Sequence, residues 1–488
     1  MKTSYAITLS KSENAQNLCS GCNDRASFNL YAGVFALSFS AMYIADAEGF
    51  HSWFVVVLNV IWLLLGKQQV LALLSSFLIS NELAAYCSVA AWLLLAPKDC
   101  GGNSHLKIDR MSLVLICLIL ANSVLQSYQL GTLANTIAYF GYIAILAWVG
   151  RRAYLTIDKQ DLMLAVKSFA AAEAFVSLLI IVRCGVEPSD AHYGTFGNAH
   201  YCGLICGVML LLITCELVST KRGLMTSDTL LCILLTIVIF LADAKAAIGA
   251  GVICIGVCLL FWFFNRRSTT SSFPVIGTMV TVLVAMIAAS FLLDLPTFRN
   301  LVTSQDFPLS QFFNEYVYFD GLGTNKFEYM AGTLSQMTES GQLLCGYGLG
   351  DYGSRFANLF GYTYTYRPPG ALNDLVATLF DSHMLPEYAN YASKYSVEVA
   401  SVIQWYSAVL SYPFSSVISV VAEIGLIGIV LIMRLIHRAR LNLSAQLVLA
   451  FFFGACITDL YLDHLQSAGV LAIVIAVNCC MSNVKNDG

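Results

Sequence analysis

The sequence predicts an all-α polytopic membrane protein, and three observations lead to that fold class. Of the 488 residues, 58% are hydrophobic and only 11% are charged, whereas soluble domains carry about 25% charged residues. Apolar runs long enough to cross a bilayer recur along almost the whole chain. Lysines and arginines gather between alternate runs, as they do in the cytoplasmic loops of membrane proteins. We therefore expect one polytopic domain rather than several soluble ones.

Fourteen apolar segments are candidate crossings, since a crossing helix needs about 20 apolar residues, or fewer where the bilayer thins. They cover residues 28–47, 52–66, 68–80, 83–96, 111–128, 131–149, 164–183, 201–218, 229–243, 245–264, 274–293, 414–433, 445–461 and 466–482. The segments 68–80 and 83–96 form either a hairpin that turns at Asn81-Glu82 or one long helix. The expected range is therefore 12 to 14 crossings.

Positive charge favours the hairpin and fourteen crossings. With the N-terminus inside, 18 of the 26 lysines and arginines fall in inner segments. A single helix over 68–96 would put Lys11, Arg25 and Lys67 on the side opposite to the rest. The expected order along the chain is a cytoplasmic tail, eleven crossings, a large external loop, three crossings and a second cytoplasmic tail. These parts cover residues 1–27, 28–293, 294–413, 414–482 and 483–488.

The external segment 294–413 holds 13 of the 24 tyrosines. A structureless loop of that length would be unusual in a compact protein, and its aromatic content argues against disorder. We expect short helices near 325–341 and 371–382, lying over the external mouth of the bundle. Aromatic rings in such a loop would suit the apolar faces of sugars.

The stretch CGYGLGDYGSRFAN, Cys345 to Asn358, combines glycines with Asp351 and Arg355. Glycines let the backbone approach a ligand closely, and exposed N–H groups beside a cation bind anions. The GxxxxGK[ST] pattern of nucleotide-binding loops is missing, and the expected face lies away from the nucleotide pool. The stretch is therefore either an anion-binding loop or a tight turn that returns the chain to the membrane.

Few other cations are expected at the external face. Arg183 closes the segment 164–183, where snorkelling to the interface would also explain it. Lys245 stands in LADAKAAIG between two apolar runs. It is either a functional cation at the membrane edge or the ion-pair partner of Asp243.

Carboxylates and imidazoles in or beside the apolar segments are candidates for proton transfer. Glu82, Glu173 and Glu423 are each a proton-relay group, a catalytic carboxylate or a polar contact between helices. His192 and His200 flank YGTFGN in an external loop. A neutral imidazole there is either a general base or an ordinary surface residue.

Three stretches occur in an order that resembles the O-antigen ligase and Wzy-type O-antigen and exopolysaccharide polymerase family. YGTFGNAHYCGLICGVMLL follows an external loop, LADAKAAIGAGVICI lies in the next hairpin, and CGYGLGDYGSRFAN precedes PFSSVISVVAEIGLIGIVLI. The resemblance covers roughly residues 160–435 and includes the large external loop before a late helix. It implies a membrane glycosyltransferase of the C-type superfamily.

The resemblance also implies a reaction and its partners. The donor is a glycan on undecaprenyl pyrophosphate, transferred with inversion at the periplasmic face of the bacterial inner membrane. No metal or other cofactor is expected, and the lone CxxC of Cys19 and Cys22 lacks the second ligand pair of a structural zinc site. A chain-length regulator is a further candidate partner beside membrane lipid, and no nucleic acid is expected.

Without a metal, cationic side chains must stabilise the pyrophosphate leaving group. We assign that role to Arg183, Lys245, Arg355 and Arg367. Lys245 stands where many relatives carry arginine, so it keeps the charge but lacks the bidentate fork. The candidates for the residue that activates the acceptor hydroxyl are Asp351, Glu423, His192 and His200.

One departure from the family bears on the acceptor. The ligases carry a histidine shortly before the late helix, where this chain has Phe414-Ser415-Ser416. We therefore expect a polymerase that elongates a lipid-linked glycan, with a ligase to the lipid A core as the alternative. A lipid-linked oligosaccharide flippase is the alternative from another class, although transporters usually contain two related halves and no internal repeat is visible.

Overall fold

The computed structural model describes residues 26–66, 69–96, 109–130, 133–185, 193–220, 227–242, 247–248, 251, 326–352, 415–457 and 461–479. Contacts divide the chain into two compact units. The first unit comprises Met1–Asp99 with Ala153–Phe298, and the second comprises Cys100–Arg152 with Arg299–Gly488. We expected a single polytopic domain, so the two interleaved units are a feature that hydropathy did not reveal.

The regular elements within the described ranges are helical, and their lengths identify a membrane protein. Five helices are long and apolar enough to cross a bilayer: Ala26–Ile44, Arg110–Tyr128, Lys159–Cys184, Ala199–Leu217 and Ser416–Ala439. Five shorter apolar helices are His51–Leu64, Glu82–Leu95, Ser227–Leu241, Leu443–Cys456 and Leu465–Val477. The all-α membrane class is thus confirmed. The predicted segments 245–264, 274–293 and 371–382 lie outside the described residues, apart from 247–248 and 251.

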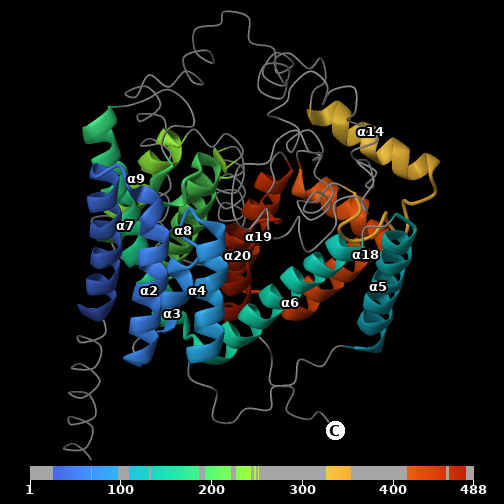
Figure 1. Ribbon diagram of the computed structural model, residues 1–488, viewed down its shortest axis with the longest axis horizontal. Helices are drawn as coiled ribbons and strands as arrows, with labels where there is room; N and C mark the ends of the chain where they lie inside the picture. The colour runs from blue at the N-terminus through green and yellow to red at the C-terminus, as the bar shows by residue number, and fades with distance from the viewer. Residues whose placement is uncertain are drawn as a thin grey trace, which may run out of the picture. The chain divides into compact units, whose positions relative to one another are not determined.

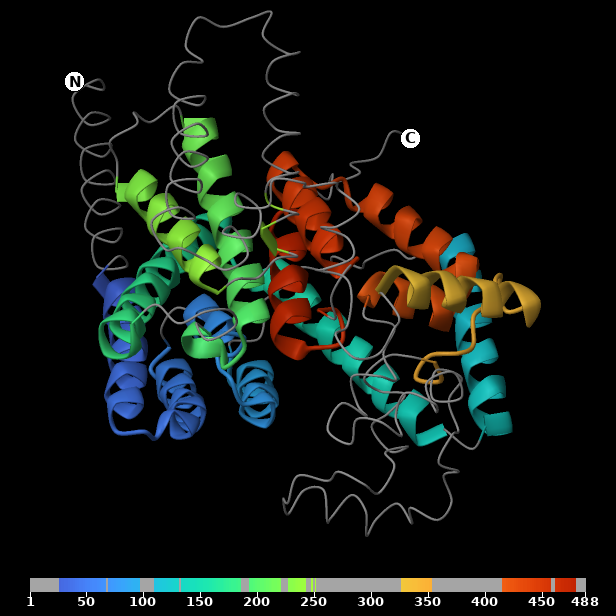
Figure 2. The same cartoon turned by 90° about the horizontal axis from the view of Figure 1, so that it is seen from above.

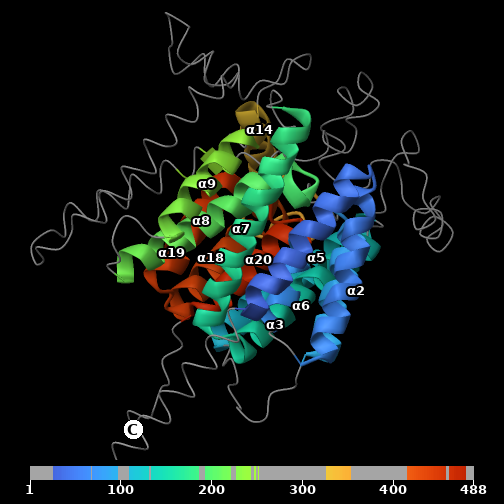
Figure 3. The same ribbon diagram turned by 90° about the vertical axis from the view of Figure 1, so that its left-hand side faces the viewer.

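The first unit contains two groups of neighbouring helices. After the helix Ala26–Ile44 come η1 (Glu48–Phe50), α2 (His51–Leu64), α3 (Gln69–Ser75) and α4 (Glu82–Leu95), followed later by α7 (Lys159–Cys184), η2 (Gly194–Phe196), α8 (Ala199–Thr220) and α9 (Ser227–Leu241). Figure 1 shows α2, α3 and α4 side by side, and Figure 3 shows α7, α8 and α9 together.

The segment 68–96 is a hairpin rather than one helix. Asn81 ends the turn and caps α4, because its side-chain oxygen accepts the Ala84 N–H at 3.0 Å. The helical part of 68–80 is the seven-residue α3, which is about 10 Å long and therefore shorter than the predicted segment.

A buried polar network holds this hairpin against α2. Asn59 donates to the Ala72 carbonyl at 3.0 Å and to the Ser88 hydroxyl at 2.6 Å. Its side-chain oxygen accepts from Ser75 at 3.0 Å and also from Tyr31. Hydrogen bonds of this kind join helices in a membrane, where apolar association alone is weak.

The second unit contains the helices that carry the glycine-rich stretch. They are α5 (Arg110–Leu130), most of α6 (Leu133–Thr156), α14 (Lys326–Glu339), α18 (Ser416–Ala439), α19 (Leu443–Cys456) and α20 (Leu465–Val477). The helix α14 confirms the predicted element at 325–341, and Figure 2 shows it lying across α18, which it contacts.

Two helices of this unit run past their apolar segments. The helix α18 continues to Ala439 and so includes Arg434 and Arg438, whereas α6 continues to Thr156 and includes Arg151 and Arg152. Arginine side chains have long apolar stems that reach the interface from within a helix. Hydropathy therefore places the helix ends too early.

Candidate functional site

The described part of the glycine-rich stretch, residues 345–352, forms a turn that pairs with a break in α18. Gly425 lies inside α18 with φ 61° and ψ −169°, values outside the helical region. It stands nine residues after Ser416, about 14 Å along the helix axis. Because α18 is long and apolar enough to cross a membrane, this break falls within the span rather than at its end.

Backbone hydrogen bonds from the turn satisfy the groups that the break releases. The N–H groups of Tyr347 and Gly348 donate to the carbonyls of Ala422 and Glu423 at 2.8 and 3.0 Å. In return, Leu426 and Ile427 donate to the carbonyls of Leu343 and Leu344 at 3.0 and 3.1 Å. Irregular backbone at membrane depth requires such internal partners. The turn and the broken helix are therefore one structural element.

Glycine is required where the two backbones meet. A Cβ added to Gly346 would lie 2.4 Å from the Glu423 carbonyl oxygen, and one added to Gly425 would lie 2.4 Å from that of Leu344. Both residues also have positive φ, which side chains disfavour. Gly346, one of the glycines that predicted a close-approach loop, thus serves an approach between two parts of the same chain.

Asp351 is buried at the end of this turn. Its Oδ2 accepts a hydrogen bond from the Ser127 hydroxyl of α5 at 3.0 Å. The neighbouring backbone is fixed by the same helix, since Leu349 N–H donates to Ser123 Oγ at 3.0 Å. From α6, Thr136 donates to the Leu349 carbonyl at 2.9 Å. Asp351 is therefore a buried carboxylate held by the Ser127 hydroxyl, on a backbone that α5 and α6 fix at Leu349.

The tyrosines of the turn are core residues. Tyr347 and Tyr352 stack with ring centroids 5.0 Å apart and 9° between their planes, and both are buried. Their hydroxyls reach α14 and the turn that follows it, Tyr352 bonding Thr333 at 2.8 Å and Tyr347 bonding Ser340 at 2.9 Å. We expected the tyrosine-rich loop to offer rings to sugars, and these two rings instead hold α14 against the turn.

Glu423 is buried two residues before Gly425, the residue at which α18 breaks. It stands in the same unit as Asp351, because Gly348 donates to its carbonyl and lies against the Asp351 carboxylate. The structure thus brings together two of the four predicted base candidates.

Sequence reasoning missed Asp463, which is also buried. It follows Tyr461 and Leu462, whose N–H groups donate to Ser416 Oγ at 2.8 and 3.1 Å. These hydrogen bonds hold the connection between α19 and α20 against the start of α18. The available signal was an acid between two apolar runs, in YLDHL, but such residues are usually solvated.

Arg183 belongs to the first unit and already has partners. It forms an ion pair with Asp46 at 2.7 Å and donates to the Tyr43 carbonyl. Its guanidinium also lies 4.9 Å from the centroid of the Tyr43 ring. Arg183 thus ties α7 to the end of the first helix, and a phosphate bound there would share the guanidinium with Asp46.

His200 and Glu173 mark the second glycine-containing turn, which lies in the first unit. The Asn198 side chain accepts the N–H of His200 at 2.8 Å and so begins α8. Glu173, buried within α7, accepts hydrogen bonds from the N–H and the hydroxyl of Thr195 in YGTFGN. Glu173 therefore holds this turn, and of its three possible roles the structure shows a polar contact.

The remaining predicted site residues lie outside the described residues: His192, Lys245, Arg355 and Arg367. Within the described part of the chain, no group of three or more histidine, cysteine, aspartate or glutamate side chains is arranged to hold a metal ion. No protein-family model matches the chain, and no curated protein matches it significantly.

Proposed function

We propose that the protein is a polysaccharide polymerase of the bacterial inner membrane, with fourteen crossings and both termini in the cytoplasm. It transfers a glycan from undecaprenyl pyrophosphate to a lipid-linked repeat unit at the periplasmic face. The observation that carries the proposal is the buried Asp351 carboxylate, held by Ser127 on a glycine turn at one end of α5. A carboxylate fixed in this way can accept a proton from a sugar hydroxyl.

The proposed reaction is a direct displacement. The acceptor hydroxyl oxygen attacks the anomeric carbon of the donor sugar and forms the new glycosidic bond. The bond from that carbon to the pyrophosphate oxygen breaks, and its electron pair leaves with the pyrophosphate. The hydroxyl proton passes to Asp351. Attack from the face opposite to the leaving group inverts the anomeric configuration.

Cationic residues would stabilise the departing pyrophosphate. Arg355 follows Asp351 by four residues, which makes it the first candidate for this role. Lys245, Arg367 and Arg183 are the others, and Arg183 would bind the phosphate beside its partner Asp46. A guanidinium binds two phosphate oxygens at once, which lysine cannot do in the same geometry.

The break in α18 supports a second candidate function, a transporter of lipid-linked oligosaccharide. Discontinuous membrane helices often form the substrate sites of transporters, and Gly425 interrupts α18 within its span. The groups released by this break are, however, bonded to the turn at Leu343–Gly348. That pairing indicates that the break has a structural role. We therefore prefer the polymerase over the transporter as the function of the protein.

The test is reconstitution of the purified full-length chain in vesicles with a lipid-linked repeat unit. A polymerase yields glycans longer than one unit and releases one undecaprenyl pyrophosphate for each bond formed. Movement of the substrate across the bilayer without elongation would replace the polymerase by a transporter. Transfer to added lipid A core without elongation would replace it by a ligase.

A further inference from the structure

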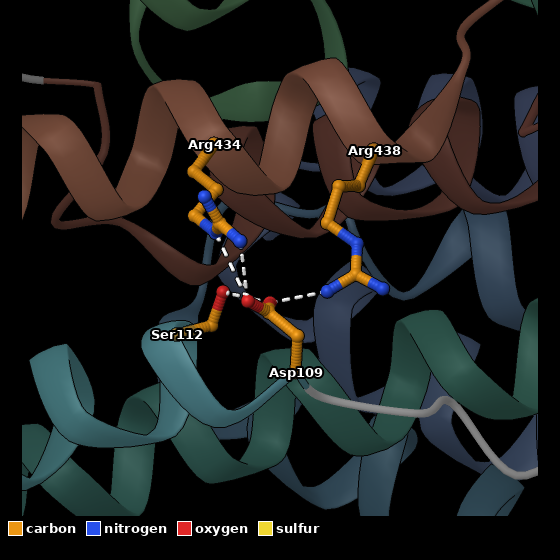
Figure 4. A network of polar contacts seen from close by, with 4 residues as sticks. All are labelled: Asp109, Ser112, Arg434 and Arg438. Atoms are coloured by element: carbon orange, nitrogen blue, oxygen red, sulfur yellow. Dashed lines mark hydrogen bonds and ion pairs between the residues drawn. The ribbon is translucent and has the colours of Figure 1, made fainter.

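One carboxylate at the far end of α5 binds two arginines of α18. Asp109, directly before α5, accepts hydrogen bonds from Nε and Nη2 of Arg434 and from Nη1 of Arg438. Ser112 donates to the same carboxylate from the first turn of α5. Figure 4 shows both guanidinium groups converging on Asp109 from one face of α18.

The three side chains together carry a charge of +1. Hydrogen bonds from Arg434 and Ser112 hold the pKa of the Asp109 carboxyl well below its usual range, so this aspartate is ionised at neutral pH. Each guanidinium has five N–H donors, and Asp109 uses two from Arg434 and one from Arg438. Both arginine side chains are exposed, at 42% and 44%. Donors therefore remain for a second anion.

The surface beside the two arginines is apolar. On α18, Val430 and Met433 are exposed, and at the start of α5 the same is true of Met111, Leu113 and Val114. In a helix that crosses a membrane, exposed apolar side chains face lipid tails. Arg434 and Arg438 stand where this lipid-facing surface ends, which is the level of the phospholipid phosphates.

We infer that Asp109, Arg434 and Arg438 form a binding site for the phosphate of an anionic phospholipid headgroup. Asp109 fixes the positions of the two guanidinium groups before the phosphate binds, so little side-chain entropy is lost on binding. The phosphate accepts hydrogen bonds from the remaining donors, and the acyl chains lie along Val430 and Met433. Phosphatidylglycerol and cardiolipin carry this headgroup charge, whereas phosphatidylethanolamine has no net charge.

The site would stabilise the α5–α18 pair. The two helices are joined near Ser127 through the glycine turn and at the opposite end through Asp109. A ligand that binds only the folded arrangement raises its stability by mass action. Anionic lipid should therefore raise the unfolding temperature, independently of whether the protein is a polymerase.

The test is native mass spectrometry of the full chain in detergent, titrated with cardiolipin, phosphatidylglycerol or phosphatidylethanolamine. We expect retained anionic lipid in the wild type and a roughly tenfold or greater loss of affinity in R434Q/R438Q, at about 1 kcal/mol for each cation. R151Q is the matched control, since Arg151 is an exposed arginine near the end of α6 in the same unit. R434K/R438K keeps the charge and separates its effect from that of the guanidinium fork.

Three outcomes would overturn the inference. In the first, R434Q/R438Q binds anionic lipid as tightly as the wild type and R151Q. In the second, phosphatidylethanolamine is retained equally well. In the third, inorganic phosphate at the same concentration gives the same rise in unfolding temperature, which would make the ligand a free anion. If the double variant fails to fold, the single variant R438Q, which keeps the two bonds from Arg434 to Asp109, decides the question by the same titration.

Discussion

Asp351 has the features of a proton acceptor because its surroundings fix its position. The carboxylate is buried, yet it accepts a hydrogen bond from Ser127 and lies against Gly348. A group held in this way is preorganised, so in the proposed reaction it would need little rearrangement to reach the acceptor hydroxyl. Ser127 is a positioning residue in this account, acting through Asp351 rather than on the substrate.

Replacing Ser127 by alanine should slow chain elongation without preventing folding. A hydrogen bond to a charged group contributes about 1.5–3 kcal/mol, which corresponds to a roughly 10- to 100-fold lower kcat. S38A is a control, because the Ser38 hydroxyl bonds to the Phe35 carbonyl of its own helix in the first unit. An unchanged kcat in S127A, measured by the rate of undecaprenyl pyrophosphate release, would contradict this role.

Asp109 supports a prediction about pH. Its folded-state pKa is depressed, first through Arg434, so its contribution is fully present above the unfolded pKa of about 3.9. That contribution is lost as pH falls through the lower folded-state value. The gap in unfolding temperature between the wild type and D109N should therefore stay constant from pH 8 to 5 and shrink below about pH 4. A gap that shrinks between pH 8 and 6 would show that other groups control it.

At the scale of elements, the pairing of the turn with the broken helix α18 explains why residues 343–348 keep a fixed position relative to a membrane helix within the second unit. Four backbone hydrogen bonds join residues 343–348 to 422–427. Each bond satisfies a group that would otherwise lie unpaired within the span, at a cost of several kcal/mol. The pairing therefore holds the turn, and with it Asp351, in place.

Replacing Gly425 by alanine should break this element. The new Cβ would meet the Leu344 carbonyl oxygen at 2.4 Å, at a positive φ that alanine disfavours. We expect a loss of at least ~2 kcal/mol of stability, measured as a lower unfolding temperature in detergent. G141A is the matched control, since Gly141 lies in α6 with open space around its Cβ position and should be neutral or slightly stabilised. Equal unfolding temperatures for the two variants would exclude the paired element.

Helices were easier to predict than the site. Apolar runs predicted the positions of the described apolar helices, although not their ends, because a helix buried in lipid needs a long run of apolar residues. The break at Gly425 was missed, since its partner turn lies about 80 residues earlier and a glycine within an apolar run is common in membrane helices. Asp463 was missed for a similar reason: the connection that carries it is held by hydrogen bonds from Tyr461 and Leu462 to Ser416, which spacing does not encode.

At the scale of the whole molecule, the two units each hold a glycine-containing turn against a buried carboxylate. Thr195 meets Glu173 in the first unit, and Gly348 meets Asp351 in the second. Both turns belong to segments that the positive charges assign to the external face. The proposed periplasmic reaction therefore requires that both turns lie at the external face of the membrane.

Reporter fusions test that premise. Alkaline phosphatase is active only outside the cytoplasm, so a fusion near residue 330 should be active and one near residue 268 should be inactive. The expected difference follows from fourteen crossings with both termini inside. The opposite pattern would place Asp351 and its turn at the cytoplasmic face and remove the periplasmic substrates from consideration.

The most direct measurement of the central claim is chain elongation by D351N in the reconstituted system. The carboxamide keeps the size of the carboxylate but accepts a proton poorly, so kcat should fall at least about 100-fold while substrate binding and the unfolding temperature change little. E339Q is the matched control, because Glu339 is an exposed carboxylate at the end of α14 and its variant should elongate normally. Elongation by D351N at the rate of the wild type and E339Q would contradict the account.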